Sequence, residues 1–122
     1  VDTLLARGAR DFEQRQFEAA LSAFEDAARL APNDERPALW SGRAAGRLAE
    51  KASPLTAYRL ARRTLQEFER AYALNPRNLD VLDDLIEFHA KAPRFMGGRP
   101  ALAAQLRERR AQLQSEASAT AP

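Results

Sequence analysis

The 122-residue sequence contains no cysteine, which excludes a disulfide framework, a thiolate nucleophile and a cysteine-based zinc site. Proteins without cysteine occur in oxidising and in reducing compartments, so the redox compartment stays open. No stretch approaches the ~20 apolar residues of a membrane-spanning helix, and none has the pattern of a signal peptide. We therefore predict no membrane insertion. Because the chain does not begin with methionine, we expect that it has been processed or trimmed.

Residues that favour β-strands are also few. Valine, isoleucine and the aromatic residues are sparse, whereas alanine, leucine, arginine, glutamate and glutamine dominate, which is the composition of helices. The apolar fraction of 45% is enough for one core in one domain. Nineteen Lys and Arg residues against seventeen Asp and Glu residues give a net charge of only +2, too small to indicate a nucleic-acid partner. The Arg-rich stretches at 62–63 and 107–110 have acids nearby and no interleaved aromatic residues for base stacking.

One helix ending occurs twice in the chain. Apolar residues recur at helical spacing from Phe17 to Leu30 and stop at Ala-Pro-Asn-Asp (31–34), where proline cannot continue a helix. The same ending returns at Asn-Pro-Arg-Asn (75–78), after a run that includes Phe68 and Tyr72. The sequence therefore contains an internal repeat of helical segments.

This repeat resembles the tetratricopeptide repeat (TPR), a helix-turn-helix unit with a small residue in its first helix, an Ala-x3-aromatic pattern in its second and a closing proline. In the first copy, a unit of 34 residues, Gly8, Ala20, Phe24, Ala27 and Pro32 stand at those places. The resemblance implies an all-α, right-handed superhelical stack of three TPR-like antiparallel helix pairs. The first copy departs from the pattern at Arg7 and Asp11, where apolar and aromatic residues are usual, and Leu4 replaces the frequent tryptophan.

The second copy is longer than the first. Pro32 and Pro76 are 44 residues apart, ten more than one unit, which indicates a ten-residue insertion around 50–54 that lengthens the second pair. Ser53 has the character of an N-cap and Pro54 that of a first-turn proline, so the following helix should project past its partner. A third copy opens at Asn78, with Ile86 in place of the small residue.

These boundaries give one repeat domain over residues 1–114. We expect repeats at about 1–34, 35–78 and 79–114, and helices near 2–14, 17–31, 35–51, 54–74, 78–91 and 99–114. Residues 115–122 have no apolar side chain larger than alanine, except the closing proline, and we expect them to be disordered.

No residue pattern indicates catalysis, and we predict that the chain is not an enzyme and uses no cofactor and no metal. His89 is the only imidazole, no nucleophile motif accompanies it, and a packed structural role is favoured over a catalytic one. Gly97 and Gly98 lack the strand and the Lys-Ser/Thr of a phosphate loop, which favours a tight turn between helices. Acidic residues at 80, 83, 84 and 87 form either a solvated helix face, which we favour, or a site for a hard cation.

The resemblance implies that the first helices of the repeats line a concave groove that binds a protein or peptide. Aligning the repeats places twelve residues along it: Leu5, Ala9, Phe12, Glu13, Arg36, Leu39, Arg43, Arg47, Asp80, Asp83, Glu87 and Lys91. Trp40 lies beside this row, either as an anchor for a partner or, as we favour, as a filler between the first two repeats.

The groove residues also suggest how the groove is charged. We expect Arg36, Arg43 and Arg47 to face Asp80, Asp83 and Glu87, either paired with each other or available to a partner of mixed charge. TPR domains that grip the C-terminal carboxylate of a chaperone use Lys, Asn and Arg here. Leu5, Ala9, Asp83 and Glu87 stand at those places, so the resemblance implies that this clamp is absent.

The sequence thus predicts a non-catalytic scaffold that binds a protein or peptide in its groove. The alternative is a structural self-association or spacer module of a larger envelope assembly, for which a homodimer is possible. The lengthened second repeat and the Ala-Pro-x-Phe-Met-Gly-Gly turn at 92–98 resemble a group of bacterial TPR proteins that are usually exported. This resemblance favours a periplasmic or exported protein, with a cytoplasmic location as the alternative.

Overall fold

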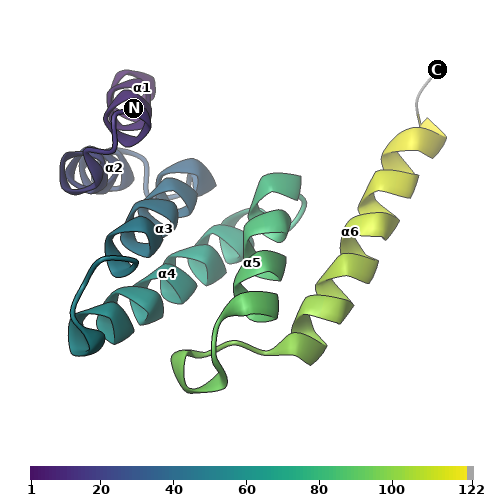
Figure 1. Ribbon diagram of the computed structural model, residues 1–122. Helices are drawn as coiled ribbons and strands as arrows, with labels where there is room; N and C mark the ends of the chain where they lie inside the picture. Colours follow the sequence, from purple (N-terminus) through teal and green to yellow (C-terminus); the bar gives the residue numbers. More distant parts are fainter. Residues whose placement is uncertain (121–122) are drawn as a thin grey trace.

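The computed structural model describes residues 1–120, and over this range the chain is all-helical with no strand. Six α-helices and one short 3-10 helix follow one another (Figure 1): α1 (Asp2–Glu13), α2 (Phe17–Leu30), α3 (Glu35–Ala49), α4 (Pro54–Leu74), α5 (Leu79–Lys91), η1 (Arg94–Met96) and α6 (Pro100–Thr120). The all-α prediction is confirmed. The predicted boundaries of the first five α-helices agree with the structure to within two residues.

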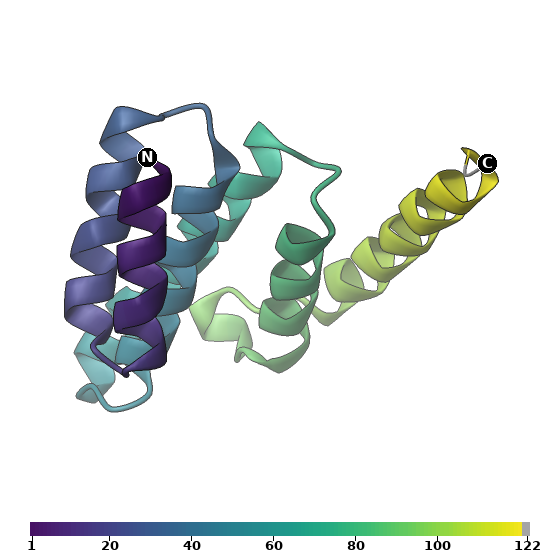
Figure 2. The same ribbon diagram turned by 90° about the horizontal axis from the view of Figure 1, so that it is seen from above.

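Helices that are neighbours in sequence are also neighbours in space. α1 packs on α2, α2 on α3, α3 on α4, α4 on α5, and α5 on α6. Figures 1 and 2 both place α1 and α2 at one end of the molecule and α6 at the other. Two clusters of buried apolar side chains hold this row together, a smaller one among α1, α2 and α3 and a larger one from α3 to α6.

The first two helical hairpins repeat one close contact. A Cβ atom added at Gly8 would lie 2.4 Å from the ring of Phe24, and one added at Gly42 would lie 2.6 Å from the ring of Phe68. Only glycine therefore lets the first helix of each hairpin lie this close to the aromatic ring of the second. Ile86 occupies the corresponding place in the third hairpin, so α5 and α6 do not share this contact.

The turns that precede α3 and α5 also repeat. Asp34 and Asn78 are the N-cap residues, and each follows a proline by two positions. The Asp34 side chain accepts from the backbone N–H of Arg36 at 3.0 Å, and the Asn78 side chain accepts from that of Asp80 at 2.9 Å. Both caps satisfy helix donors that would otherwise lack a partner, which explains why these two helices begin where they do.

The insertion lengthens α4, as the sequence predicts. α4 has 21 residues and its partner α3 has 15. Pro54 opens the helix and Ser53 is its N-cap residue, but the Ser53 hydroxyl donates to the hydroxyl of Thr56 at 3.2 Å and bonds no backbone N–H of the helix. The fixed backbone angle of Pro54 therefore starts the helix without help from a side-chain cap.

The predicted disorder of the C-terminal segment is wrong for residues 115–120, since α6 continues to Thr120. Alanine and glutamate in this segment favour helix, and Leu113 is buried close to where the prediction ended the helix. Arg77 Nη2 donates to Glu116 Oε2 at 3.0 Å, and this ion pair ties the last part of α6 to the turn before α5. Residues 121–122 of the predicted tail lie outside the described residues.

Candidate functional site

A cleft of about 590 Å³ opens between α3 and α5. Both helices pack on α4, which lies between them and forms the floor of the cleft with Ala61, Thr64 and Phe68. The wall on α3 includes Gly42 and Gly46, whose missing side chains let α3 lie close to Phe68 and Thr64 of α4. The sequence thus produces an apolar floor by placing two glycines one turn apart on the same helix face.

The rim of the cleft carries charges of both signs. α3 contributes Arg43 and Arg47, and Glu50 directly follows this helix; α5 contributes Asp84, Glu87 and Lys91. Apolar side chains close the two ends, with Phe12 of α1 at one and Pro93 and Met96 of the η1 loop at the other. Such a site favours an apolar side chain on the floor and polar groups of either charge at the rim.

One ion pair crosses the cleft. The Arg43 guanidinium donates to both carboxylate oxygens of Asp84, from Nε to Oδ2 at 2.5 Å and from Nη2 to Oδ1 at 3.2 Å. The two side chains are only 26% and 19% exposed, so solvent screens this pair less than a surface pair. The same guanidinium lies 4.8 Å above the ring of Trp40. Arg43 is therefore held by two partners, Asp84 and Trp40, and joins α3 to α5.

Arg47 has a different environment. Its guanidinium carbon lies 4.8 Å from the ring centre of Phe17 and 5.9 Å from that of Phe12, while Nε donates to Glu50 at 3.1 Å. Stacking on two aromatic rings and an ion pair with Glu50 hold this arginine in place. Arg47 therefore lies at the rim near the end of α3 as part of an ion pair.

The structure places five of the twelve predicted groove residues on the cleft: Phe12, Arg43, Arg47, Glu87 and Lys91. Leu39 does not line it, because this side chain is 3% exposed in the larger core cluster. Leu5 and Trp40 pack against the smaller cluster instead. Arg36 binds Asp34 and Asp2 at the N-terminal edge of α3.

The sequence predicts that Arg36, Arg43 and Arg47 face Asp80, Asp83 and Glu87, either paired with them or available to a partner. Within residues 1–120 the structure shows none of these pairs. Asp83 binds Arg110 of α6, Glu87 binds Lys91 four residues later at 3.2 Å, and Arg43 binds Asp84 instead. Adjacent helix positions differ by about 100° around the axis, so Asp83 faces α6 while Asp84 faces α3. The acidic face is thus divided among three helices, and within residues 1–120 no group of three or more such side chains has the geometry to hold a metal ion.

Trp40 fills the space between the first two hairpins. Its ring stacks on Phe24, with centroids 5.4 Å apart, and meets Phe12 edge to face at 5.5 Å. The side chain is half-buried. This packing confirms the prediction of a filler.

His89 is packed, as the sequence predicts, and it organises the loop before α6. The side chain is 2% exposed, and its Nδ1 accepts from the backbone N–H of Arg99 at 3.2 Å. Burial lowers the pKa of His89 and favours the neutral imidazole, which accepts this bond. Gly97 has a φ of +105°, and a Cβ at Gly98 would lie 1.9 Å from the Ala92 carbonyl oxygen. Both glycines are therefore needed for this tight turn.

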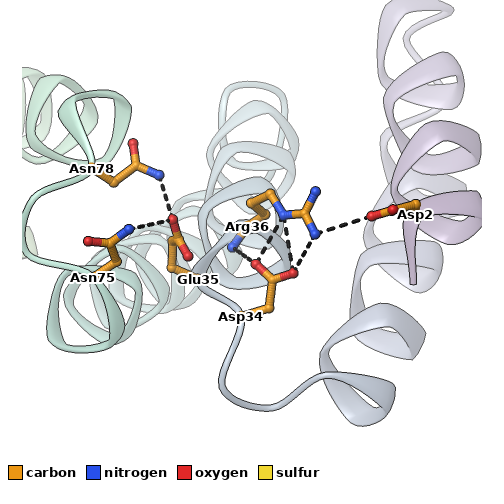
Figure 3. Close-up of polar contacts among 6 residues, drawn as sticks. All are labelled: Asp2, Asp34, Glu35, Arg36, Asn75 and Asn78. Atoms are coloured by element: carbon orange, nitrogen blue, oxygen red, sulfur yellow. Dashed lines mark hydrogen bonds and ion pairs between the residues drawn. The ribbon is translucent and has the colours of Figure 1, made fainter.

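A second polar cluster joins the N-terminal end of α3 to its neighbours (Figure 3). The Glu35 carboxylate accepts from the side-chain amides of Asn75 at 2.9 Å and Asn78 at 2.8 Å, while Arg36 bridges Asp34 and Asp2. Burial opposes the charge of Glu35, but the two amide donors outweigh it and lower the pKa of Glu35. The cluster fixes the turn between α4 and α5 against α3, and its side chains lie away from the cleft.

Several cleft residues were not among the predicted site residues, notably Thr64, Phe68, Asp84, Phe88 and Met96. Phe68 and Thr64 belong to a second helix of the repeat, which the groove assignment did not consider. Asp84 directly follows the predicted Asp83, so the repeat alignment missed it by one residue. Met96 comes from the turn before α6, whose path the sequence does not specify.

No model of a known protein family matches this chain, and no curated protein matches it. The resemblance to TPR proteins therefore stays a prediction. Among residues 1–120, no helix has both the length and the apolar character needed to cross a membrane.

Proposed function

We propose that the chain is a TPR-like, non-catalytic scaffold that binds a peptide segment of another protein in the cleft between α3 and α5. The observation that carries this proposal is the cleft itself, which has an apolar floor and a rim with charges of both signs. Its volume of about 590 Å³ lies within the usual range for sites that bind small ligands or a few side chains. The repeated Gly8–Phe24 and Gly42–Phe68 contacts support the TPR-like part of the proposal.

The rim favours a segment of mixed charge. It holds three bases and three acids, so neither a strongly acidic nor a strongly basic peptide is complementary to all of it. An aliphatic or aromatic side chain would lie over Thr64 and Phe68, where it displaces water from apolar surface. On the resemblance alone, we also propose an exported or periplasmic location in bacteria.

Self-association is the second candidate. The exposed positions of α6, the terminal helix, carry only Ala, Pro, Ser, Gln, Arg and Glu side chains up to residue 119. This surface offers no large apolar side chain to bury against a second copy. Peptide binding in the cleft is therefore the better supported function.

A substitution at Gly46 tests the proposal. A Cβ atom there meets nothing closer than 3.5 Å, so Gly46→Ala should fold normally, whereas the longer side chain of Gly46→Leu should occupy the floor of the cleft. Peptides selected from a display library on the wild-type chain should bind Gly46→Ala within a few-fold and lose at least about tenfold in affinity to Gly46→Leu.

Chemical shift mapping supplies the location of binding. The selected peptides should perturb amide signals of α3 and α5 that border the cleft, with little change in α2. Peptides that bind Gly46→Leu as well as wild type, or that perturb only signals remote from the cleft, would show that another surface is used. A concentration-dependent dimer that buries the cleft would favour self-association.

A further inference from the structure

Two segments without any acidic residue meet along one edge of the molecule. Residues 51–66 and 88–107 contain no Asp or Glu and together hold eight bases: Lys51, Arg59, Arg62, Arg63, Lys91, Arg94, Arg99 and Arg107. The rest of the chain contains eleven bases and all seventeen acids. The small net charge of the chain thus hides a strong separation of charge.

The two segments lie side by side because η1 packs on α4. The rings of Tyr58 and Phe95 are parallel, with centroids 6.3 Å apart, and the turn at Gly97 lies against Leu65 and Arg62. In Figures 1 and 2 the η1 loop lies beside α4, and in Figure 1 the start of α4 and this loop lie along the same edge of the molecule.

The same edge also exposes apolar side chains. Leu55, Tyr58 and Phe95 are 62%, 37% and 68% exposed and account for three of the five large hydrophobic side chains that are exposed in the described residues. We call these three residues, with Lys51, Arg59, Arg62, Arg94 and Arg99, the basic tip. The lengthened part of α4 supplies Leu55 and Tyr58, so the insertion creates half of this surface.

The bases of the basic tip are available to a partner. In the described part of the chain, none of the five makes an ion pair, whereas the nearby Arg63 and Lys91 bind Glu25 and Glu87. Arg94 and Arg99 line a hollow of about 330 Å³ with Gly98, Pro100 and Ala101. Like charges gathered without counter-charges destabilise the folded chain slightly, and an anionic partner would relieve this repulsion.

We propose that the basic tip binds the surface of an anionic lipid bilayer. Bases attract the negative headgroups, and the hollow between Arg94 and Arg99 has room for a headgroup phosphate. Leu55 and Phe95 then enter the interfacial layer, where apolar and aromatic side chains are stabilised while arginine side chains reach the headgroups. Contact of this kind needs no helix that spans the bilayer.

The shape and chemistry of the tip favour lipid over other anionic partners. The cleft, which is the concave surface suited to a peptide, does not include Leu55, Tyr58 or Phe95. A nucleic acid would bind the arginine and lysine side chains and stack on the aromatic rings of the tip, but contact with Leu55 would add nothing to its affinity. This inference concerns a surface separate from the proposed peptide site, so the two proposals succeed or fail independently.

Sedimentation with vesicles tests the proposal on the full chain. Binding should be strong to phosphatidylcholine vesicles that contain phosphatidylglycerol, weak to phosphatidylcholine alone, and reduced by added salt. Arg59→Gln with Arg94→Gln should weaken binding by about fivefold for each base removed. Arg7→Gln with Arg10→Gln, on exposed parts of α1, removes the same charge elsewhere and should change binding by less than about twofold.

The apolar contribution has its own test. Leu55→Ser with Phe95→Ser should weaken vesicle binding by at least about tenfold at unchanged charge, since two large apolar side chains leave the interface. The tryptophan introduced by Phe95→Trp should be quenched by brominated acyl chains, with a larger loss of emission than wild type, whose Trp40 is remote from the tip. Circular dichroism should show unchanged helix content, because all of the substituted side chains are exposed.

Three outcomes would overturn the proposal. The first is absence of binding to the phosphatidylglycerol vesicles at low salt. The second is an equal loss of binding for the α1 control and the tip variants. The third is binding to polyglutamate or to an oligonucleotide that is as strong as binding to vesicles and unaffected by Leu55→Ser with Phe95→Ser.

Discussion

Ser41 buries a hydroxyl group in α3 that has no hydrogen-bond partner among the described residues. The residue is 1% exposed, and a buried polar atom without a partner costs roughly 1–3 kcal/mol of stability. We expect Ser41→Ala to stabilise the fold by about 1 kcal/mol, measured by urea unfolding, because it removes this cost and adds helix propensity. Ser22→Ala, at an exposed position of α2, is the matched control and reports helix propensity alone. Equal effects at both positions would mean that the Ser41 hydroxyl is satisfied in solution.

The neutral form of His89 is part of the fold. Burial lowers its pKa, with Glu69 opposing and Arg99 adding to the shift, so the unfolded chain binds a proton more readily than the folded one. The stability that His89 contributes is therefore complete above the ordinary histidine pKa of about 6.5 and is lost as the pH falls below it. Urea unfolding between about pH 7.5 and pH 5.5 should show this loss, with a slope of at most about 1.4 kcal/mol per pH unit. His89→Gln, which keeps an acceptor for the Arg99 N–H, should flatten the profile. An unchanged slope in this variant would assign the loss to other groups.

At the scale of the helix, the glycines of α1 and α3 have different roles that a matched pair of substitutions separates. Gly8→Ala places a methyl group within 2.4 Å of the Phe24 ring, which is fully buried and stacked on Trp40. We expect a net loss of about 1–2 kcal/mol, since overpacking exceeds the gain in helix propensity. Gly46→Ala meets nothing closer than 3.5 Å and should raise stability by about 0.5–1 kcal/mol. Thermal unfolding should therefore shift in opposite directions. A rise in the unfolding temperature for both variants would show that Gly8 is not at a close contact.

The sequence predicts the helices well because their ends carry local signals. Pro32 and Pro76 stop two helices, and Asp34 and Asn78 cap the next two, so each boundary depends on residues within one turn of it. The end of α6 has no such signal. Composition alone predicts a disordered tail for its last residues, although alanine and glutamate also favour helix when the preceding turn is packed on the protein.

The cleft is less predictable, because it depends on how helices rotate against each other. The repeat alignment places Asp83 opposite α3, but the structure places Asp84 there and turns Asp83 toward Arg110. A rotation of one residue changes the partner of every charged side chain on α5. Leu39 was assigned to the groove for the same reason and is buried in the core. Whether a segment is helical and how long the helix is depend on local sequence, whereas the rotation of the helix about its own axis is set by packing against its neighbours.

At the scale of the whole molecule, Glu35 is a second polar link between the α3–α4 and α5–α6 hairpins, in addition to the Arg43–Asp84 ion pair. Its carboxylate binds both Asn75 and Asn78 in the turn between α4 and α5. Glu35→Ala and Asn75→Ala should each destabilise the fold by about 1 kcal/mol. The double variant should lose less than the sum, since both single variants remove the same Glu35–Asn75 hydrogen bond. A double-mutant cycle from urea unfolding measures the difference. Strictly additive losses would mean that this hydrogen bond contributes nothing to stability in solution.

α6 should open before the interior helices α3 and α4. α6 packs on α5 and buries only three apolar side chains, Ala103, Leu106 and Leu113, whereas α3 and α4 lie in the interior of the row and have neighbours on both sides. Because local stability follows the number of buried contacts, amides of α6 should exchange with deuterium through an opening that costs less free energy than global unfolding. Amides in the middle of α3 and α4 should exchange only by global unfolding. Leu113→Ala removes one of the three contacts and should speed exchange in α6 by at least about tenfold, while exchange in α1 and α2 stays the same when opening of α6 is separate from global unfolding. If α6 is instead as protected as α4, and Leu113→Ala speeds exchange everywhere to the same extent, the six helices unfold as one unit and α6 is an integral part of the core.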